Sequence, residues 1–209
     1  MFKDIRIALI FSVVLLDIIG IGIIFPIIPD LLKEVGVDQN ASAAFWGGLL
    51  SSSYAFTQFV FSPTIGTLSD IFGRRPILLI ASLLLGLDYL VMGFAENIFI
   101  LFVGRILGGL AGGTIATGTA YLADLSATKD KKKNFAIIGA AFGLGFILGP
   151  IIGGLMGEIS VRAPFFLSAL LCFLNFFLCF FLLPETLKLR TKNKFVIKKL
   201  NPFFNMSYI

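Results

Sequence analysis

Six long apolar runs dominate this sequence and leave little chain for anything else. They lie near residues 5–29, 44–68, 76–95, 98–122, 134–157 and 163–183. About 20 apolar residues form a helix that crosses a hydrocarbon core of about 30 Å. A strand of an outer-membrane barrel would instead alternate over about ten residues. The sequence therefore predicts an all-α integral membrane protein, a bundle of six transmembrane helices.

The composition agrees with a membrane protein and excludes several other classes. Of the 209 residues, 57% are hydrophobic and 14% are charged, whereas a soluble domain has roughly 25% charged residues. We therefore exclude soluble enzymes. We also exclude nucleic-acid binding, because the basic residues stand in short segments between apolar runs rather than on a solvated face. The chain has no His, so we expect no His-dependent metal site and no cofactor. Cys172 and Cys179 share one run and predict buried thiols.

The basic residues indicate how the chain crosses the membrane, because Lys and Arg are retained on the cytoplasmic side. With the N-terminus inside, the cytoplasmic segments hold fourteen of the Lys and Arg residues and the outer segments hold only Lys33 and Arg162. We therefore expect a multi-pass protein of the cell (inner or plasma) membrane with both termini in the cytoplasm. The bundle would occupy residues 1–187, and 188–209 would be a basic cytoplasmic segment.

The first apolar run resembles a signal peptide in one respect, since Lys3 and Arg6 precede it. However, it continues beyond the length of a signal core and contains Asp17, with no small-residue cleavage site after it. We therefore interpret it as a retained transmembrane helix.

Ionisable side chains occur inside three of the predicted spans. A charge at mid-membrane costs roughly 2.5 to 3.5 kcal/mol on insertion scales, so it needs a compensating environment. Two interpretations stay open: an Asp–Arg pair that only locks helices together, or a proton or substrate site in a polar cavity. Intramembrane charges usually belong to functional sites. We therefore expect Asp17 and Arg105 to form part of a proton or substrate site. We expect the neutral Asn175 to join two helices. The predicted coupling site and cavity comprise Asp17, Gln58, Asp88 and Arg105.

Small residues recur at helical spacing in the fourth and fifth runs. In the fourth run, Gly104, Gly108 and Gly112 form a face that lets helix backbones approach closely. In the fifth run, a proline stands among glycines, which indicates a bend or a sliding surface. Close packing alone would also explain this pattern. The candidate hinge consists of Gly145, Gly149, Pro150, Gly153 and Gly154.

A short charged segment, residues 66–76, separates the second and third runs. Its sequence is Gly-Thr-Leu-Ser-Asp-Ile-Phe-Gly-Arg-Arg-Pro. Gly66 and Gly73 permit a tight turn. Asp70 can accept hydrogen bonds from helix amides or Arg, and Arg74 and Arg75 would anchor the cytoplasmic face. A hairpin that only sets topology would need no more than the two arginines.

This segment resembles the signature Gly-x-Leu-x-Asp-x-x-Gly-Arg-Arg between the second and third helices of the major facilitator superfamily. Arg105 with Gly109 and Gly113 resembles the fourth-helix motif of proton antiporters in the same superfamily. The candidate hinge resembles their fifth-helix motif, although Ala136 stands where the longer form of that motif has another glycine.

Further segments are similar to tetracycline/proton antiporters and their multidrug relatives. They are Leu16-Asp17-x-x-Gly20-x-Gly22-x-x-x-Pro26-x-x-Pro29, Leu87-Asp88-Tyr89 and Pro184-Glu185-Thr186, the last at the end of the sixth helix. Asn201-Pro202-Phe203 is similar to the start of the central cytoplasmic loop. The resemblance covers the chain but only the N-terminal half of the family's fold, which has two six-helix bundles with the site between them.

The resemblance implies a secondary active transporter that exports tetracycline-like or other amphipathic drugs, driven by the proton gradient. Its partners would be the lipid bilayer, a drug-like substrate, protons, and a C-terminal six-helix half or a second copy, without which we expect no transport. The alternatives are a truncated six-helix protein that does not transport, and half of a symporter or uniporter for another substrate. Two residue sets follow. The cytoplasmic gate would comprise Gly66, Asp70, Gly73, Arg74, Arg75 and Asp124. A second set of aromatic residues could line an apolar cavity, although aromatic residues in a membrane bundle more often face lipid or pack between helices: Phe25, Tyr54, Phe56, Phe59, Phe142 and Phe146.

Overall fold

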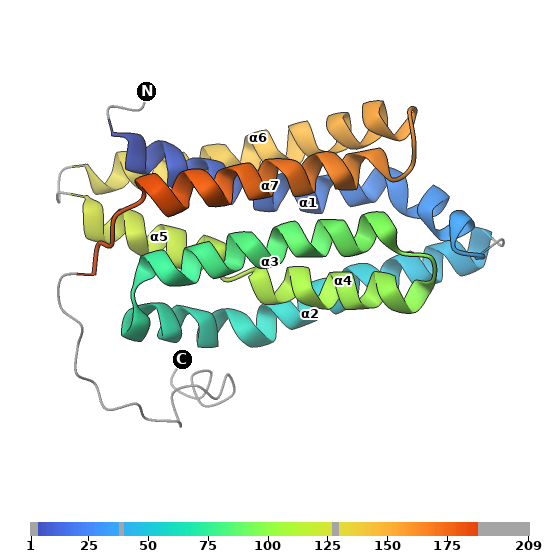
Figure 1. Ribbon diagram of the computed structural model, residues 1–209, viewed down its shortest axis with the longest axis horizontal. Helices are drawn as coiled ribbons and strands as arrows, with labels where there is room; N and C mark the ends of the chain where they lie inside the picture. The colour runs from blue at the N-terminus through green and yellow to red at the C-terminus, as the bar shows by residue number, and fades with distance from the viewer. Residues whose placement is uncertain (1–3, 38–39, 127–129, 188–209) are drawn as a thin grey trace.

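The computed structural model describes residues 4–37, 40–126 and 130–187, and these residues form one elongated bundle of helices (Figure 1). Lys3, Lys129 and the predicted basic segment 188–209, with its Asn201-Pro202-Phe203 sequence, lie outside the described residues. The helices run along the long axis of the bundle. They are α1 (Ile5–Glu34), α2 (Asn40–Phe72), α3 (Arg74–Phe94), α4 (Ile98–Ala111), α5 (Thr114–Leu125), α6 (Lys131–Gly157) and α7 (Ala163–Leu182). The chain reverses direction between successive helices, except that α5 continues α4 in line (Figure 1).

Each predicted apolar run contains helix, but the fourth run differs from the expectation. We expected one helix over 98–122, and the structure has α4 and α5 in line, interrupted at Gly112 and Gly113. The Gly112 amide donates to the Gly109 carbonyl at 3.2 Å, which is the i to i+3 contact of a tightened turn. Taken together, α4 and α5 cover Ile98–Leu125 as one membrane-crossing segment of 28 residues.

Five of the described segments are long and apolar enough to cross a membrane, namely α1, α3, α4 with α5, α6 and α7. The second predicted span is the exception. Its helix α2 is the longest, with 33 residues, but nine of these are Ser or Thr. These hydroxyls lower its hydropathy, and many of them bond within the helix, as Thr57 does to the Ser53 carbonyl at 2.8 Å. A helix with this composition suits a wall that faces a polar interior.

Local sequence explains where several helices begin. The Asp4 carboxylate caps α1 by accepting the Arg6 backbone amide at 3.0 Å, and the side-chain hydrogen bond from Arg6 lowers the pKa of Asp4. Asn97 caps α4 in the same way, accepting from the Ile100 amide at 3.0 Å. Between α2 and α3 a single residue, Gly73, makes the turn with φ of +112°, a conformation that glycine adopts without strain.

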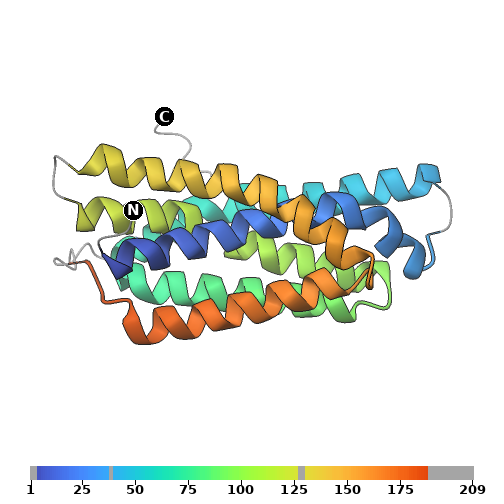
Figure 2. The ribbon, with the colours of Figure 1, turned by 90° about the horizontal axis from the view of Figure 1, so that it is seen from above.

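The most extensive helix–helix contact among the described residues joins α1 and α6, which lie side by side in Figure 2. A methyl group added at Gly149 would meet the Gly22 Cα and the Ile19 carbonyl oxygen at 2.7 Å, and both are backbone atoms. Gly145 and Gly153 pack on the same helix in the same way. Three of the four glycines of the candidate hinge therefore provide the close packing that the sequence allowed, and α6 continues as one helix through Pro150.

Candidate functional site

A buried ion pair joins α3 and α4 in the middle of the bundle. Arg105 Nη2 donates to both carboxylate oxygens of Asp88, at 2.9 and 2.7 Å. The two side chains are 3% and 1% exposed. Two glycines of α4 make room for the carboxylate: a Cβ at Gly104 would lie 3.1 Å from Asp88 Oδ1, and one at Gly108 would overlap Oδ2. The small residues of α4 thus seat Asp88 against Arg105.

Asp17, the second buried carboxylate, lies in the same polar cluster but has different partners. Thr114, the first residue of α5, donates to Asp17 Oδ2. The Tyr54 hydroxyl donates to Oδ1 at 3.3 Å. The Tyr54 ring also lies under Arg105, with the guanidinium carbon 5.5 Å from the ring centroid, the geometry of a cation–π contact. Tyr54 therefore links Asp17 to Arg105, and the break between α4 and α5 brings Thr114 to the carboxylate.

A cavity of about 280 Å³ opens beside this cluster. Arg105 and Gln58 form part of its wall, and the Gln58 side chain also donates to the Gly112 carbonyl at 3.4 Å. The Nε of Arg105 is buried and has no hydrogen-bond partner among the described residues. Apolar walls with a few convergent polar groups are typical of small-molecule sites. The lining residues are Ile21, Ile24, Phe25, Ser51, Tyr54, Ala55, Gln58 and Arg105.

The aromatic residues that we expected around an apolar cavity divide into two groups. Phe25 and Tyr54 line the cavity. Phe56, Phe59 and Phe146 are not among its lining residues, and 68%, 59% and 49% of their surface is exposed. Phe142 packs at the edge of a buried apolar cluster formed by α1, α3, α5, α6 and α7. The structure therefore places two of the six residues at this cavity, and an apolar cavity lined by the other four stays a prediction. In a helix that is apolar on every face, hydrophobic periodicity does not indicate which aromatic side chains face the interior of the bundle.

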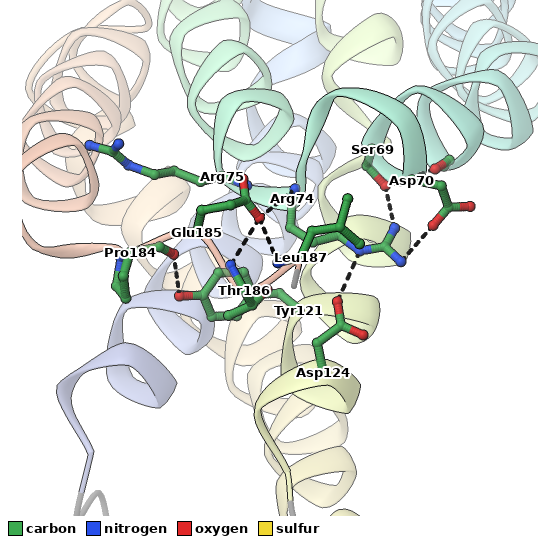
Figure 3. Close-up of polar contacts among 11 residues, drawn as sticks. Ser69, Asp70, Arg74, Arg75, Tyr121, Asp124, Pro184, Glu185, Thr186 and Leu187 are labelled. Carbon is green, nitrogen blue, oxygen red and sulfur yellow. Dashed lines mark hydrogen bonds and ion pairs between the residues drawn. The ribbon is translucent and has the colours of Figure 1, made fainter. Parts of the chain in front are cut away.

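The turn between α2 and α3 forms a second polar site, at one end of the bundle (Figure 3). The Arg74 guanidinium contacts Asp70 at 2.5 Å and Asp124, in the last turn of α5, at 3.2 Å. It also donates to the Ser69 hydroxyl at 2.6 Å, and that hydroxyl donates to the Gly66 carbonyl at 2.7 Å. Arg74 and Asp124, which the sequence analysis placed together in the gate, are thus in direct contact.

The remaining predicted residues take the following places. Gly145, Gly149 and Gly153 pack on α1, whereas a methyl group at Gly154 would meet nothing within 4 Å. Asn175 joins two helices as expected, because its Oδ1 accepts from the Ser12 hydroxyl at 2.7 Å.

Sequence reasoning missed three contributors to these sites. Thr114 was overlooked as a partner of a buried acid, and Ser69 as a partner of Arg74. Glu185 was noted only as part of a family resemblance, although its carboxylate accepts from the Arg74 and Arg75 backbone amides at 3.0 and 3.2 Å. One local signal did point to such an acceptor: the helix that begins at Arg74 follows a glycine, which has no side chain with which to cap it.

The described residues thus form a helical membrane bundle with a buried ion pair beside a cavity and a charged turn at one end. The chain belongs to the Major Facilitator Superfamily, whose family model matches residues 10–209. It is 42% identical to the tetracycline resistance protein, class B, of Escherichia coli, over 87% of this chain and 44% of that protein. It is 33% identical to the quinolone resistance protein NorA of Staphylococcus aureus, over 90% of this chain and 47% of that protein.

Solved structures give the same fold. The human organic anion transporter TETRAN superposes with a TM-score of 0.75 at 26% identity, covering 87% of this chain and 47% of that one. A double tryptophan mutant of XylE superposes with a TM-score of 0.74 at 18% identity, covering 87% and 45%, and shows the fold alone. The chain thus spans a little under half the length of these relatives. Its fold is that of the N-terminal half of a superfamily transporter.

Proposed function

We propose that this chain forms half of a secondary active transporter that exports tetracycline-like or other amphipathic drugs in exchange for protons. The observation that carries the proposal is the buried cluster of Asp17, Tyr54, Asp88 and Arg105 beside a largely apolar cavity. An amphipathic molecule suits such walls, because apolar surface supplies affinity and a few polar groups fix orientation. The names of the relatives, which refer to tetracycline and quinolone resistance, support the drug class.

We propose that the two buried carboxylates couple transport to protons. While Asp88 is ionised, it holds the Arg105 guanidinium at 2.7 Å. A proton on Asp88 removes that charge, and Arg105 is then released toward the cavity that it lines. Asp17 is connected to Arg105 through Tyr54, so its protonation alters the same cluster. The position of Arg105, and with it the affinity of the cavity for a drug, would thus depend on whether the carboxylates carry protons, which links the binding of drug to the binding of protons.

The turn between α2 and α3 would act as the cytoplasmic gate. Arg74 joins the end of α2, through Asp70, to the end of α5, through Asp124. Charge-assisted contacts of this kind hold one conformation closed and are broken when helices rock apart. The glycines of α6 would provide the surface along which α1 and α6 slide during that movement.

Transport would require a second bundle, because alternating access in this fold is a rocking of two halves about the site between them. We propose a C-terminal six-helix half or a second copy of this chain as that partner. Both termini would lie in the cytoplasm, as the distribution of basic residues indicates. A chain without a partner would belong to the alternative class, a six-helix membrane protein that does not transport. A half that takes up another substrate is the second alternative.

The test is reconstitution of the purified chain in lipid vesicles with an imposed pH gradient, with its oligomeric state fixed by cross-linking. We expect tetracycline flux only from an assembly of two bundles. Asp17→Asn should abolish the flux, whereas Asp30→Asn should leave it unchanged. Asp30 is the matched control because it lies on the same helix, is exposed and pairs with Lys33 at 2.9 Å. Flux from a cross-linked monomer would contradict the two-bundle requirement, and pH-dependent flux that survives Asp17→Asn would remove Asp17 from the coupling site.

A further inference from the structure

The residues at the start of helix α3 provide no side-chain acceptor for the first backbone amides of the helix. The first amides of a helix have no partner within it. Here the residue at the cap is Gly73, which has no side chain, and the third helical residue is Pro76, which has no amide hydrogen. The Gly73 amide donates to the Ser69 carbonyl at 3.2 Å. The amides of Arg74 and Arg75 therefore remain to be satisfied from elsewhere in the chain.

Glu185 supplies the missing acceptors from just beyond the end of α7 (Figure 3). Its Oε1 accepts from the Arg74 amide at 3.0 Å and its Oε2 accepts from the Arg75 amide at 3.2 Å. Oε1 also accepts from the amides of Thr186 and Leu187, at 2.9 and 3.0 Å. One carboxylate thus collects four backbone amides, and its charge is favourable at the positive end of the α3 dipole.

The contact is reciprocal, because α3 also caps α7. Arg75 Nη2 donates to the Phe180 carbonyl at 2.6 Å, in the last turn of α7, and its guanidinium carbon lies 5.8 Å from the Phe180 ring centroid. The Tyr121 hydroxyl on α5 donates to the Pro184 carbonyl at 2.8 Å. We call residues 184–187 the α7 strap. Bonds from α3 and α5 hold this strap against the turn between α2 and α3.

The same carboxylate packs directly against Gly73, the glycine of the turn. A methyl group at Gly73 would overlap Glu185 Oε2 and lie 2.9 Å from its Cδ. Gly73 is therefore required for two independent reasons, its φ of +112° and the space that Glu185 occupies.

We propose that Glu185 is a positioning residue for the cytoplasmic gate. It binds the backbone of Arg74, while the side chain of the same residue joins Asp70 and Asp124. Fixing the first turn of α3 therefore fixes the direction from which the guanidinium approaches both acids. The chain that leaves α7 is in this way coupled to the gate. The inference rests on the gating role proposed above, but the contact itself can be tested without transport.

The first measurement is hydrogen exchange of the full chain in lipid nanodiscs. Glu185→Gln replaces one acceptor oxygen with an amide group that cannot accept, so a peptide containing Arg74 and Arg75 should exchange about five- to tenfold faster, as for loss of a helix cap. Thr186→Ala is the matched control. It alters the same strap, and the buried Thr186 Oγ1 has no hydrogen-bond partner among the described residues. Exchange within twofold of the unaltered chain in Glu185→Gln would overturn the capping role.

The second measurement decides between positioning and simple stabilisation. In a double-mutant cycle on thermal unfolding, Glu185→Gln and Asp124→Asn should be non-additive, because both act through Arg74. The pair Thr186→Ala and Asp124→Asn should be additive. Additivity of the first pair would overturn the positioning role even if the cap is present.

Transport adds an arm that separates this inference from the proposed function. In a transporting assembly, Glu185→Gln should lower turnover severalfold and leave the KM for tetracycline within twofold. An equal loss in turnover and binding would contradict a role confined to the gate. If the unaltered chain transports in no assembly, the proposed function fails, whereas the exchange and unfolding results still decide whether Glu185 positions Arg74.

Discussion

Arg105 holds Asp88 through a single nitrogen, since Nη2 lies within 2.9 Å of both carboxylate oxygens while the Nε of the same guanidinium has no partner among the described residues. A guanidinium has five donor hydrogens in a fixed fork. Here one guanidinium nitrogen contacts both carboxylate oxygens, whereas in a bidentate pair two guanidinium nitrogens each contact one oxygen. Donor capacity is therefore left over in a side chain that lines the cavity, and a ligand acceptor or a change in Asp88 can redirect it.

The first prediction concerns the stability of this pair. Asp88→Asn leaves a buried guanidinium without its counter-charge and should destabilise the folded chain by about 3 kcal/mol. Arg105→Gln should destabilise the folded chain by a similar amount, because it leaves the buried Asp88 carboxylate without its counter-charge. The double variant should be more stable than either single variant, because neutral amides can hydrogen-bond to each other. Thermal unfolding in detergent measures all three, and a double variant no more stable than the worse single variant would show that the charges do not compensate each other.

The second prediction concerns the contact between α1 and α6. Gly149→Ala should destabilise the bundle by about 1 to 3 kcal/mol, because its methyl group would meet two backbone atoms that cannot rotate away. Gly154→Ala is the control on the same helix, since a methyl group there meets nothing within 4 Å. It should be neutral or slightly stabilising, as alanine is the better helix former. Similar unfolding temperatures for the two variants would argue against tight packing at Gly149.

Sequence reasoning could predict much of this fold, because hydrophobic length determines where membrane helices form. It could not place the break at Gly112 and Gly113, since the glycines of α4 equally suited a continuous helix with a close-packed face. It also could not choose the partner of Arg105. Asp17 and Asp88 were both available, and the choice depends on how α3 and α4 face each other across Gly104 and Gly108.

The charged turn was more predictable than the buried cluster, for a physical reason. Asp70 and Arg74 lie one helical turn apart, and their ion pair follows from local geometry. The contact of Glu185 with the same turn spans more than a hundred residues of sequence. The glycine before α3 indicates that an outside acceptor is needed, but no local pattern identifies Glu185 as that acceptor.

The third prediction separates gating from binding. Asp70→Asn removes the contact to Arg74 at 2.5 Å, so the gate should close less often and turnover should fall about tenfold, while drug binding stays within twofold. Asp130→Asn is the control, because Asp130 is exposed at the same end of the bundle and makes no side-chain cap with α6. Flux and equilibrium binding of tetracycline should be measured on the same samples. A parallel loss of both would assign Asp70 to binding rather than to gating.

The fourth prediction concerns the two roles of Tyr54. Tyr54→Phe removes the hydroxyl that donates to Asp17 but keeps the ring under Arg105, and it should cost about 1 kcal/mol of stability. Tyr54→Leu removes both contacts and should cost at least about 1 kcal/mol more, the size of a desolvated cation–π contact. Comparing the unfolding of the two variants isolates the ring. If Tyr54→Phe is as unstable as Tyr54→Leu, the hydroxyl is the contact that matters.

The last prediction tests the orientation in the membrane. A cysteine introduced at Glu96, an exposed position between α3 and α4, should react with a membrane-impermeant maleimide on intact cells, because we expect that loop outside. A cysteine at Lys131, exposed at the start of α6, should react only after the membrane is permeabilised. The unaltered chain is the control and should label weakly, since Cys172 and Cys179 are 2% and 1% exposed. Labelling at Lys131 but not at Glu96 on intact cells would reverse the proposed topology and place the Arg74 gate on the outer face.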